Sequence, residues 1–198
     1  MGDPKFLRRR YDTPKHPWEA TRMEEERKLL DRYGLKNKRE LWKVQSVLRG
    51  FRRQARELQA RLRAGVPQAR RETDQLLGRL TRLGILSVGT PTLDDVLALS
   101  TEDVLRRRLE WVVFSKGLAP TPFSARQWIV HGHLSVGDHR VTRPGYLLPH
   151  ADEARLDYSP TSPYADDGHA VRVALRERQE RRGAAPEPPA AAAPEGGP

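Results

Sequence analysis

The chain has 198 residues, with 36 lysines and arginines against 26 aspartates and glutamates and a formal net charge of +10. It has no cysteine, which excludes disulfides and thiolate zinc sites. It also lacks an apolar run of about 18 residues and a signal-peptide core, so we expect a cytoplasmic protein that neither spans a membrane nor is secreted.

The positive charge is concentrated in two blocks. Residues 1–65 carry a net charge of +10 and residues 106–149 a net charge of +5, whereas residues 66–105 and 150–198 are slightly acidic. Arginine supplies 29 of the 36 cations, and guanidinium groups bind phosphates bidentately and stack on bases. RNA is therefore the expected partner, although a GC-rich genome would also favour arginine.

Residues 1–17 contain three prolines and show neither helical nor strand periodicity, so they should form an extended arm. The arm carries three consecutive arginines, and basic arms commonly become ordered only against nucleic acid. We therefore expect these side chains to bind RNA. They are Arg8, Arg9 and Arg10.

A helical domain is expected over residues 18–105, beginning with a helix from Trp18 to Tyr33. A second, longer helix should start after Asn37, a suitable N-cap, and reach about Ala64. Its apolar positions follow alternating steps of three and four residues, which places them on one face. They are Leu41, Val44, Leu48, Phe51, Ala55, Leu58 and Leu62.

The same helix carries a stripe of arginines, rotated by roughly 110° from its apolar face. Glu57 is the only acid between Ser46 and Leu62, so few intrahelical ion pairs are available to these arginines. We expect the stripe to contact phosphate, although such a charged face often serves only to keep a helix soluble. The predicted contacts are Arg49, Arg52, Arg53 and Arg56.

Three more helices are predicted, from Gln68 to Leu83, from Leu93 to Leu99 and from Thr101 to Ser115, and the last of them continues beyond this domain. The last two follow Thr92 and Ser100, each of which has an aspartate three residues later, as in a capping box. From residue 17 to about residue 115 the chain should therefore contain helices and loops without strands.

Residues 106–174 should form a second domain, in which a short helix is followed by strands. Thr121 suits an N-cap and Gly132 suits a C-terminal stop, so the short helix should lie between them. Apolar and polar residues then alternate on either side of Gly137 and Asp138, a pair that suits a tight hairpin.

Tyr146–Leu148 and Val171–Val173 are candidates for further strands. Residues 175–198 end in a stretch of Ala, Pro, Gly and Glu and should be a mostly disordered tail. The predicted class is α+β, with an extended N-terminal arm, a helical domain, a small helix–strand RNA-binding domain and this tail.

Several motifs resemble a known family. Three motifs of the C-terminal half closely resemble the S-four RNA-binding domain: Ala125-Arg126-Gln127-Trp128-Ile129, His131-Gly132-His133 and Pro144-Gly145-Tyr146-Leu147-Leu148. Two earlier motifs look like the archaeal and eukaryotic branch of the small-subunit ribosomal protein S-four family: Tyr33-Gly34-Leu35-Lys36-Asn37-Lys38 and Phe51-Arg52-Arg53-Gln54-Ala55-Arg56. The resemblance extends over most of the chain.

This resemblance implies a structural, non-enzymatic component of the small ribosomal subunit that needs no cofactor. It implies direct binding to small-subunit rRNA at a multi-helix junction in the 5′ region, a role in nucleating assembly, and a place beside ribosomal protein S-five, near the route by which mRNA enters. If Arg126 contacts the RNA directly, Arg126→Ala should weaken RNA binding without unfolding the domain. The implied RNA-binding positions are Arg107, Arg108, Lys116, Thr121, Arg126, Gln127, His131, Arg140 and Arg143.

Other functions remain open from the residues alone. A free RNA-binding factor, or an accessory to an RNA-modifying enzyme, would use the same module, although the chain leaves no room for a catalytic domain. A helical interaction protein could use the long helix as a coiled coil, but Phe51 and Ala55 suit intramolecular packing better. His131 and His133 have no nearby third ligand, so we expect no metal site.

Overall fold

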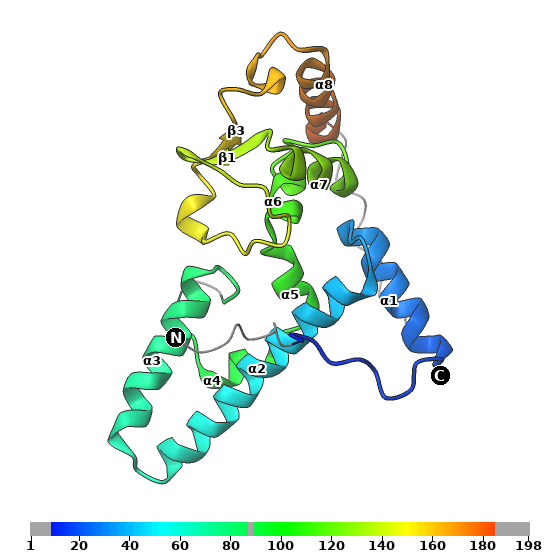
Figure 1. Ribbon diagram of the computed structural model, residues 1–198. Coiled ribbons are helices and arrows are strands. Elements are labelled where there is room, and N and C mark those ends of the chain that lie inside the picture. The colour runs from blue at the N-terminus through cyan, green and yellow to red at the C-terminus, as the bar shows by residue number, and fades with distance from the viewer. Residues whose placement is uncertain (1–8, 87–88, 185–198) are drawn as a thin grey trace, which may run out of the picture.

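The computed structural model describes residues 9–86 and 89–184 (Figure 1). The N-terminal helices α1 to α5 occupy the lower part of the molecule in this view, and a small sheet with helices α6, α7 and α8 occupies the upper part. Each part has its own cluster of buried apolar residues.

Helix α2 is the central element of the lower half, because α1, α3, α4 and α5 all contact it. The apolar face predicted for this helix is confirmed, since six of its seven residues are buried and Leu62 is partly buried against the same core. The five helices of this half are α1 (Ala20–Tyr33), α2 (Lys38–Arg63), α3 (Pro67–Arg82), α4 (Leu93–Ala98) and α5 (Thr101–Arg106).

The predicted helix ends are largely confirmed, because the expected caps are in place. Asn37 accepts a hydrogen bond from the backbone N–H of Glu40, at 3.2 Å, at the start of α2. Thr92 and Ser100 each form a complete capping box. Helix α1 begins two residues later than predicted, at Ala20, and ends as expected at Gly34, whose φ is +67°.

The single helix predicted from Thr101 to Ser115 is wrong, because the chain leaves the helix between α5 and α6. Arg108 has an extended backbone, with φ −69° and ψ +140°. Its neighbours pair with a distant segment: the Leu109 N–H donates to the Tyr146 carbonyl at 2.7 Å, and the Leu148 N–H donates to the Arg107 carbonyl at 3.0 Å. These long-range bonds replace the helical ones, and the helical sequence pattern gives no sign of them.

The upper half is a three-stranded antiparallel sheet with helices packed beside it. The strand order is β2-β1-β3. The helix that was predicted between Thr121 and Gly132 is confirmed with both of its end residues. The elements are α6 (Leu109–Ser115), α7 (Pro122–His131), β1 (Leu134–Val136), β2 (His139–Arg140), β3 (Leu156–Tyr158) and α8 (Ala170–Ala184), with 3-10 turns at His150–Asp152 and Pro163–Ala165.

The hairpin predicted at Gly137 and Asp138 is confirmed, but the other two strand predictions are wrong. Tyr146–Leu148 contributes one isolated bridge, between Leu147 and Arg108, instead of a strand of the sheet. Val171–Val173 lies in α8, where Leu175 one turn later is buried in the upper core. The third strand is β3, in a segment for which no strand was predicted.

The C-terminal prediction is also partly corrected. Helix α8 continues to Ala184, so the first part of the stretch expected to be disordered is helical. The rest of that stretch, residues 185–198, lies outside the described residues, as do residues 1–8 of the expected arm.

Candidate nucleic-acid interface

Three of the arginines predicted on α2 line one surface hollow of about 330 Å³. They are Arg49, Arg53 and Arg56, and Ser46 and Asp12 complete the wall. The guanidinium of Arg49 lies 3.3 Å from the Asp12 carboxylate, so its charge is partly compensated. Arg53 and Arg56 are exposed and form no ion pair with the described residues, so they present uncompensated positive charge to an anion.

The fourth predicted arginine of α2 has a different place. Arg52 is partly buried, and its guanidinium donates to the carbonyl of Leu99, the residue that caps the C-terminus of α4. Arginine side chains commonly satisfy the free carbonyls at a helix end in this way. Arg52 therefore holds α4 against α2 and points away from the exposed stripe.

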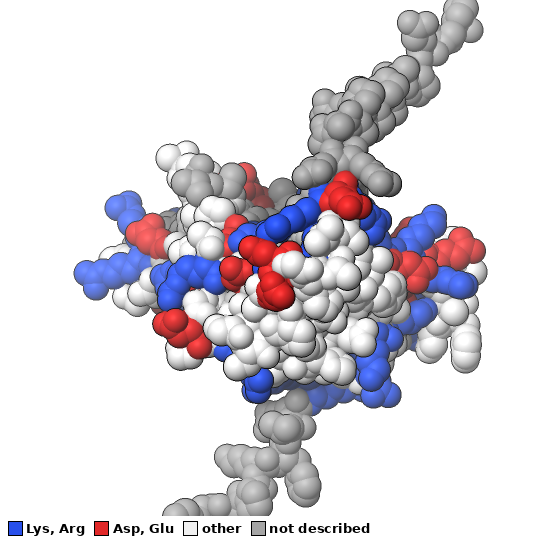
Figure 2. Space-filling view, turned by 90° about the horizontal axis from the view of Figure 1, so that it is seen from above, with Lys and Arg blue, Asp and Glu red and all other residues white. Residues whose placement is uncertain are grey.

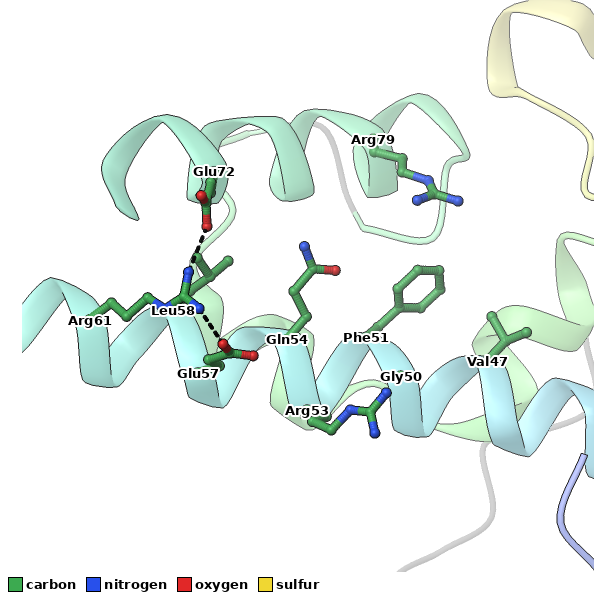
Figure 3. Close-up of a pocket in the computed structure, with 10 residues that line it drawn as sticks. All are labelled: Val47, Gly50, Phe51, Arg53, Gln54, Glu57, Leu58, Arg61, Glu72 and Arg79. Atoms are coloured by element: carbon green, nitrogen blue, oxygen red, sulfur yellow. Dashed lines mark hydrogen bonds and ion pairs between the residues drawn. The ribbon is translucent and has the colours of Figure 1, made fainter. Parts of the chain in front are cut away.

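A second groove, of about 590 Å³, runs between α2 and α3 (Figure 3). Gln54 and Phe51 project from α2 towards α3, and Arg79 of α3 lies 5.9 Å from the centre of the Phe51 ring. At the other end, Arg61 forms ion pairs with the carboxylates of Glu57 and Glu72, the latter at 3.3 Å. The groove is therefore amphipathic. The charge of Arg61 is balanced, whereas Arg53 and Arg79, which also line the groove, form no ion pair with the described residues.

The upper half exposes a second group of predicted RNA contacts. Gln127 and His131 are exposed on α7, and Arg143 is exposed in the loop after β2. The exposed Arg140 lies across Gly132, so closely that a Cβ at this glycine would be 2.9 Å from Arg140 Cδ. These side chains place amide, imidazole and guanidinium donors around the end of α7, as contacts to phosphates and 2′-hydroxyls require.

Arg107, Lys116 and Thr121, by contrast, bond within the protein. Arg107 forms an ion pair of 2.5 Å with Glu153 and donates to the Leu148 carbonyl at 2.9 Å, and only 13% of its side chain is exposed. The Lys116 ammonium donates to the Glu153 carbonyl. Thr121 accepts the Ser124 N–H at 3.1 Å as the N-cap of α7.

Arg108 and Arg126 are also engaged within the protein, in a cluster of four charges where the two halves meet. Arg108 lies 2.9 Å from Glu40 and 3.5 Å from Glu110, and 5% of its side chain is exposed. Arg126 forms ion pairs with the same two carboxylates, at 3.2 Å to Glu110. It also lies 3.5 Å from the carbonyl of Gly34. The structure thus buries Arg108 and partly buries Arg126, two residues that the family resemblance assigns to RNA.

The two carboxyl groups of this cluster differ in their electrostatics. Burial raises the pKa of Glu110 to about 7, although the charges of Arg108 and Arg126 act in the opposite direction. Burial would also raise the pKa of Glu40, but hydrogen bonds and charges from Arg126 and Arg108 outweigh it, so this pKa is lowered. Glu40 is therefore the firmly ionised partner of the two arginines.

Seen from above, the molecule has a broad uncharged surface at its upper end (Figure 2). Acidic side chains gather near the middle of this view, and at its margins lysines and arginines lie interspersed with further acidic side chains.

Comparison with known proteins agrees with this division into two halves. The family model described as "Ribosomal protein S4/S9 N-terminal domain" matches residues 4–106, and the one described as "S4 domain" matches residues 107–153. A protein named "Small ribosomal subunit protein uS4" from Picrophilus torridus is 50% identical over 175 residues, which cover 88% of this chain and 95% of that protein. The chain belongs to the uS4 family. A protein of the same name from Thermoplasma volcanium is 47% identical over 197 residues, which cover 100% of this chain and 98% of that protein.

Within this uS4 family member, the two family matches meet between Arg106 and Arg107, where α5 ends. In the residues that the structure describes, no helix is long and apolar enough to cross a bilayer, and no group of three metal-ligating side chains comes together.

The N-terminal arm lies along α2 where the structure describes it. Arg8 lies outside the described residues, and Arg10 is exposed. The guanidinium of Arg9 lies 4.4 Å from the centre of the Tyr11 ring, and that ring is 6.1 Å from the ring of Trp42 on α2. The aromatic contact fixes the arm beside the α2 hollow, so Arg9 and Arg10 extend the same basic surface.

Residue patterns gave no role in the site to three residues that hold or flank the predicted RNA contacts of this uS4 family member. Glu40 and Glu110 hold the arginines of the junction, and the position of Glu110 beside the apolar Leu109, Val112 and Val113 is a signal that could have identified a buried acid. Arg155 is exposed over the hairpin, where a Cβ on Gly137 would be 2.5 Å from its guanidinium. It lies in an irregular segment without a sequence signal.

Proposed function

We propose that the chain is a non-enzymatic structural constituent of the small ribosomal subunit in the cytoplasm, and that it binds small-subunit rRNA directly. One observation supports this most strongly: the chain matches proteins named for the small ribosomal subunit along nearly its whole length, at 47–50% identity. A protein that shared only the RNA-binding module would match one half of the chain, whereas these proteins match both halves.

The surface supports RNA as the partner. Arg53 and Arg56 on α2, and Arg140 and Arg143 near the end of α7, are exposed and free of ion pairs with the described residues. Each such cation can neutralise a phosphate and release a counterion, and this makes binding to nucleic acid depend on salt. Both halves of the molecule thus offer phosphate contacts, as a folded RNA junction would require.

The proposal extends to the details that the family resemblance implies. The binding site on the RNA is a multi-helix junction in the 5′ region, and binding there nucleates assembly of the subunit. The position is beside ribosomal protein S-five and near the route by which mRNA enters. Each half of the protein carries its own basic surface, and two such surfaces suit a protein that holds several RNA helices together.

A salt series with an RNA transcript tests the RNA contacts. We expect Arg53→Gln/Arg56→Gln to weaken binding to a transcript of the 5′ region of small-subunit rRNA. We also expect it to reduce the slope of log K against log salt by about 2, roughly 1 for each phosphate that is no longer neutralised. Arg61→Gln is the matched control, since Arg61 is exposed on the same helix but neutralised by Glu57 and Glu72. An unchanged slope in the double variant would remove the α2 hollow from the interface.

Sedimentation of a tagged chain in a lysate gradient tests the cellular assignment. An integral constituent should remain in the small-subunit peak at high salt. A chain found only in light fractions, or removed by modest salt, would instead be a free RNA-binding factor or an accessory to an RNA-modifying enzyme.

A further inference from the structure

The junction between the two halves is built from charged groups that face one another across it. Glu40 comes from the first turn of α2 in the lower half, whereas Glu110 and Arg126 come from α6 and α7 in the upper half. Arg108 lies in the connection between α5 and α6. Two carboxylates and two guanidiniums therefore form one cluster, and Glu40 is its contribution from the lower half.

The geometry makes this cluster a clamp between the halves. Arg126 reaches both oxygens of Glu40, with Oε2 at 3.1 Å from Nη1, and it also bonds Glu110 of its own half. Bidentate bonds of a planar guanidinium fix orientation as well as distance. Because Arg126 is held from both sides, α7 cannot turn relative to the start of α2 without breaking these bonds.

Close packing beside the cluster leaves little freedom at the junction. Gly34 lies against Pro122, the first residue of α7, so closely that a Cβ on Gly34 would be 2.7 Å from the Pro122 Cβ. The ring of Tyr33 packs on that of Trp111 of α6, with 4.5 Å between centres. The end of α1 and the start of α2 are thus seated directly on α6 and α7.

We propose that Glu40, Arg108, Glu110 and Arg126 form a positioning clamp that fixes the angle between the two RNA-contacting surfaces, so that both can bind one folded RNA at once. This inference rests on the proposed function. Arg126 and Arg108 then serve RNA binding through the clamp, and the phosphate contacts come from the exposed cations on either side. The side chain of Glu40 takes part in this clamp, and the N-cap of α2 uses only its backbone N–H.

Whether Glu40→Gln strengthens or weakens RNA binding distinguishes a clamp from a direct contact between Arg126 and RNA. If Arg126 bound phosphate, the nearby Glu40 would repel the RNA, and Glu40→Gln would tighten binding. If the cluster is a clamp, Glu40→Gln loosens the junction and weakens binding, although the substitution removes a negative charge from a protein that binds a polyanion. Glu57→Gln removes the same charge from the exposed side of the same helix and is the matched control.

The experiment measures the affinity of the full chain for the 5′-region rRNA transcript over a salt series. The variants are Glu40→Gln, Arg126→Gln, the double variant and Glu57→Gln, and circular dichroism checks that each is folded. We expect each clamp variant to lose about tenfold in affinity with an unchanged salt slope. We expect the double variant to bind about as well as either single variant, because both remove the same connection. Glu57→Gln should not weaken binding.

Small-angle scattering of the free proteins provides a readout that a loss of stability alone would not change. We expect the folded Glu40→Gln chain to be more extended than the wild type. Wild-type or tighter affinity of Glu40→Gln, together with a salt slope reduced by about 1 in Arg126→Gln, would overturn the clamp and make Arg126 a direct contact. If Arg126→Gln does not fold, Glu40→Gln and its scattering still decide the question. A wild-type chain that does not bind the transcript would overturn the proposed function and this inference with it.

Discussion

The carboxyl group of Glu110 lies in the interior of the molecule, with 1% of its side chain exposed. A buried carboxylate is costly unless it is paired, and its partners here are the guanidiniums of Arg108 and Arg126. Glu40 competes for the same two partners and holds the Arg108 guanidinium more closely, at 2.9 Å against 3.5 Å. Burial, which the two guanidiniums offset only in part, therefore raises the pKa of Glu110 to about 7, and its ionisation is linked to folding.

This linkage predicts how stability depends on pH. The pKa of Glu110 is about 7 in the folded chain, against an ordinary value of 4.5. Between these values the folded chain holds a proton that the unfolded chain has released, so the free energy of unfolding falls as pH rises. The Glu110 carboxyl contributes on the order of 3 kcal/mol to the free energy of unfolding. This contribution is present in full below the ordinary pKa of 4.5 and is lost as the pH rises to about 7.

Urea unfolding of the wild type and Glu110→Gln from pH 5 to 8 checks this expectation. The difference in stability between the two should change across that window in favour of the neutral glutamine as pH rises. The pKa of Glu40 is lowered, so its contribution to stability is lost as the pH falls. Both proteins contain Glu40, so this effect does not enter the difference between them. A constant difference across the window would show that Glu110 is ionised throughout.

Two glycines give a prediction about backbone strain. Gly34 has a φ of +67° and touches Pro122, whereas Gly50 lies within α2 with no atom near its absent Cβ. We expect Gly34→Ala to lower the free energy of unfolding by at least about 2 kcal/mol, because strain and a steric clash add. Gly50→Ala should raise it by about 0.5–1 kcal/mol through helix propensity. Chemical denaturation measures both, and equal effects would contradict the argument.

At the scale of elements, local signals predicted the helices well because helix ends depend on neighbouring residues. Asn37, Thr92, Ser100 and Thr121 each accept the backbone N–H three residues later, as their residue types indicate. The break between α5 and α6 and the isolated bridge at Leu147 depend instead on hydrogen bonds between segments about 40 residues apart. The antiparallel pairing of β3 with β1 is also non-local, with partners 20 to 24 residues apart. Such non-local pairing leaves no periodic pattern in a single sequence.

The short helix α4 should depend strongly on its cap. Thr92→Ala removes the half of the capping box made by the Thr92 hydroxyl, which accepts the Asp95 N–H, and should lower the free energy of unfolding by about 1 kcal/mol, within a range of 0.5–2. Thermal unfolding measures this, with Thr142→Ala in the exposed loop after β2 as the control. Equal stability of the two variants would show that tertiary contacts alone hold α4 on α2.

The candidate site could be predicted only in part, for a physical reason. The exposed arginines of α2 follow from helical spacing, because the face opposite an apolar stripe must meet solvent. Arg107, Arg108 and Arg126 are also arginines, but each forms an ion pair with a carboxylate from a distant segment, which leaves Arg108 buried and the other two partly buried. The residue type of an arginine therefore predicts its charge, while the tertiary fold decides which partner that charge has.

At the scale of the whole molecule, two apolar cores are joined at a junction that combines the charge cluster with the packing of Tyr33 on Trp111. The lower core centres on α2, and the upper core lies among α6, α7 and the sheet. A domain interface of this kind would by default allow relative motion. The buried charge cluster opposes it, because breaking one buried ion pair by removing a partner costs about 3–5 kcal/mol.

This arrangement predicts how cooperatively the chain unfolds. With the clamp intact, the two halves should unfold together, so the calorimetric enthalpy should equal the van't Hoff enthalpy of a single transition. Glu40→Gln/Arg126→Gln leaves each core intact but removes the connection, so each half then unfolds with its own stability. We expect two overlapping transitions and a calorimetric enthalpy clearly larger than the van't Hoff value.

Arg53→Gln/Arg56→Gln, which changes two exposed charges on α2, should keep the single transition. A single transition in the clamp variant as well would mean that the packing of Gly34 on Pro122 and of Tyr33 on Trp111 is enough to couple the halves.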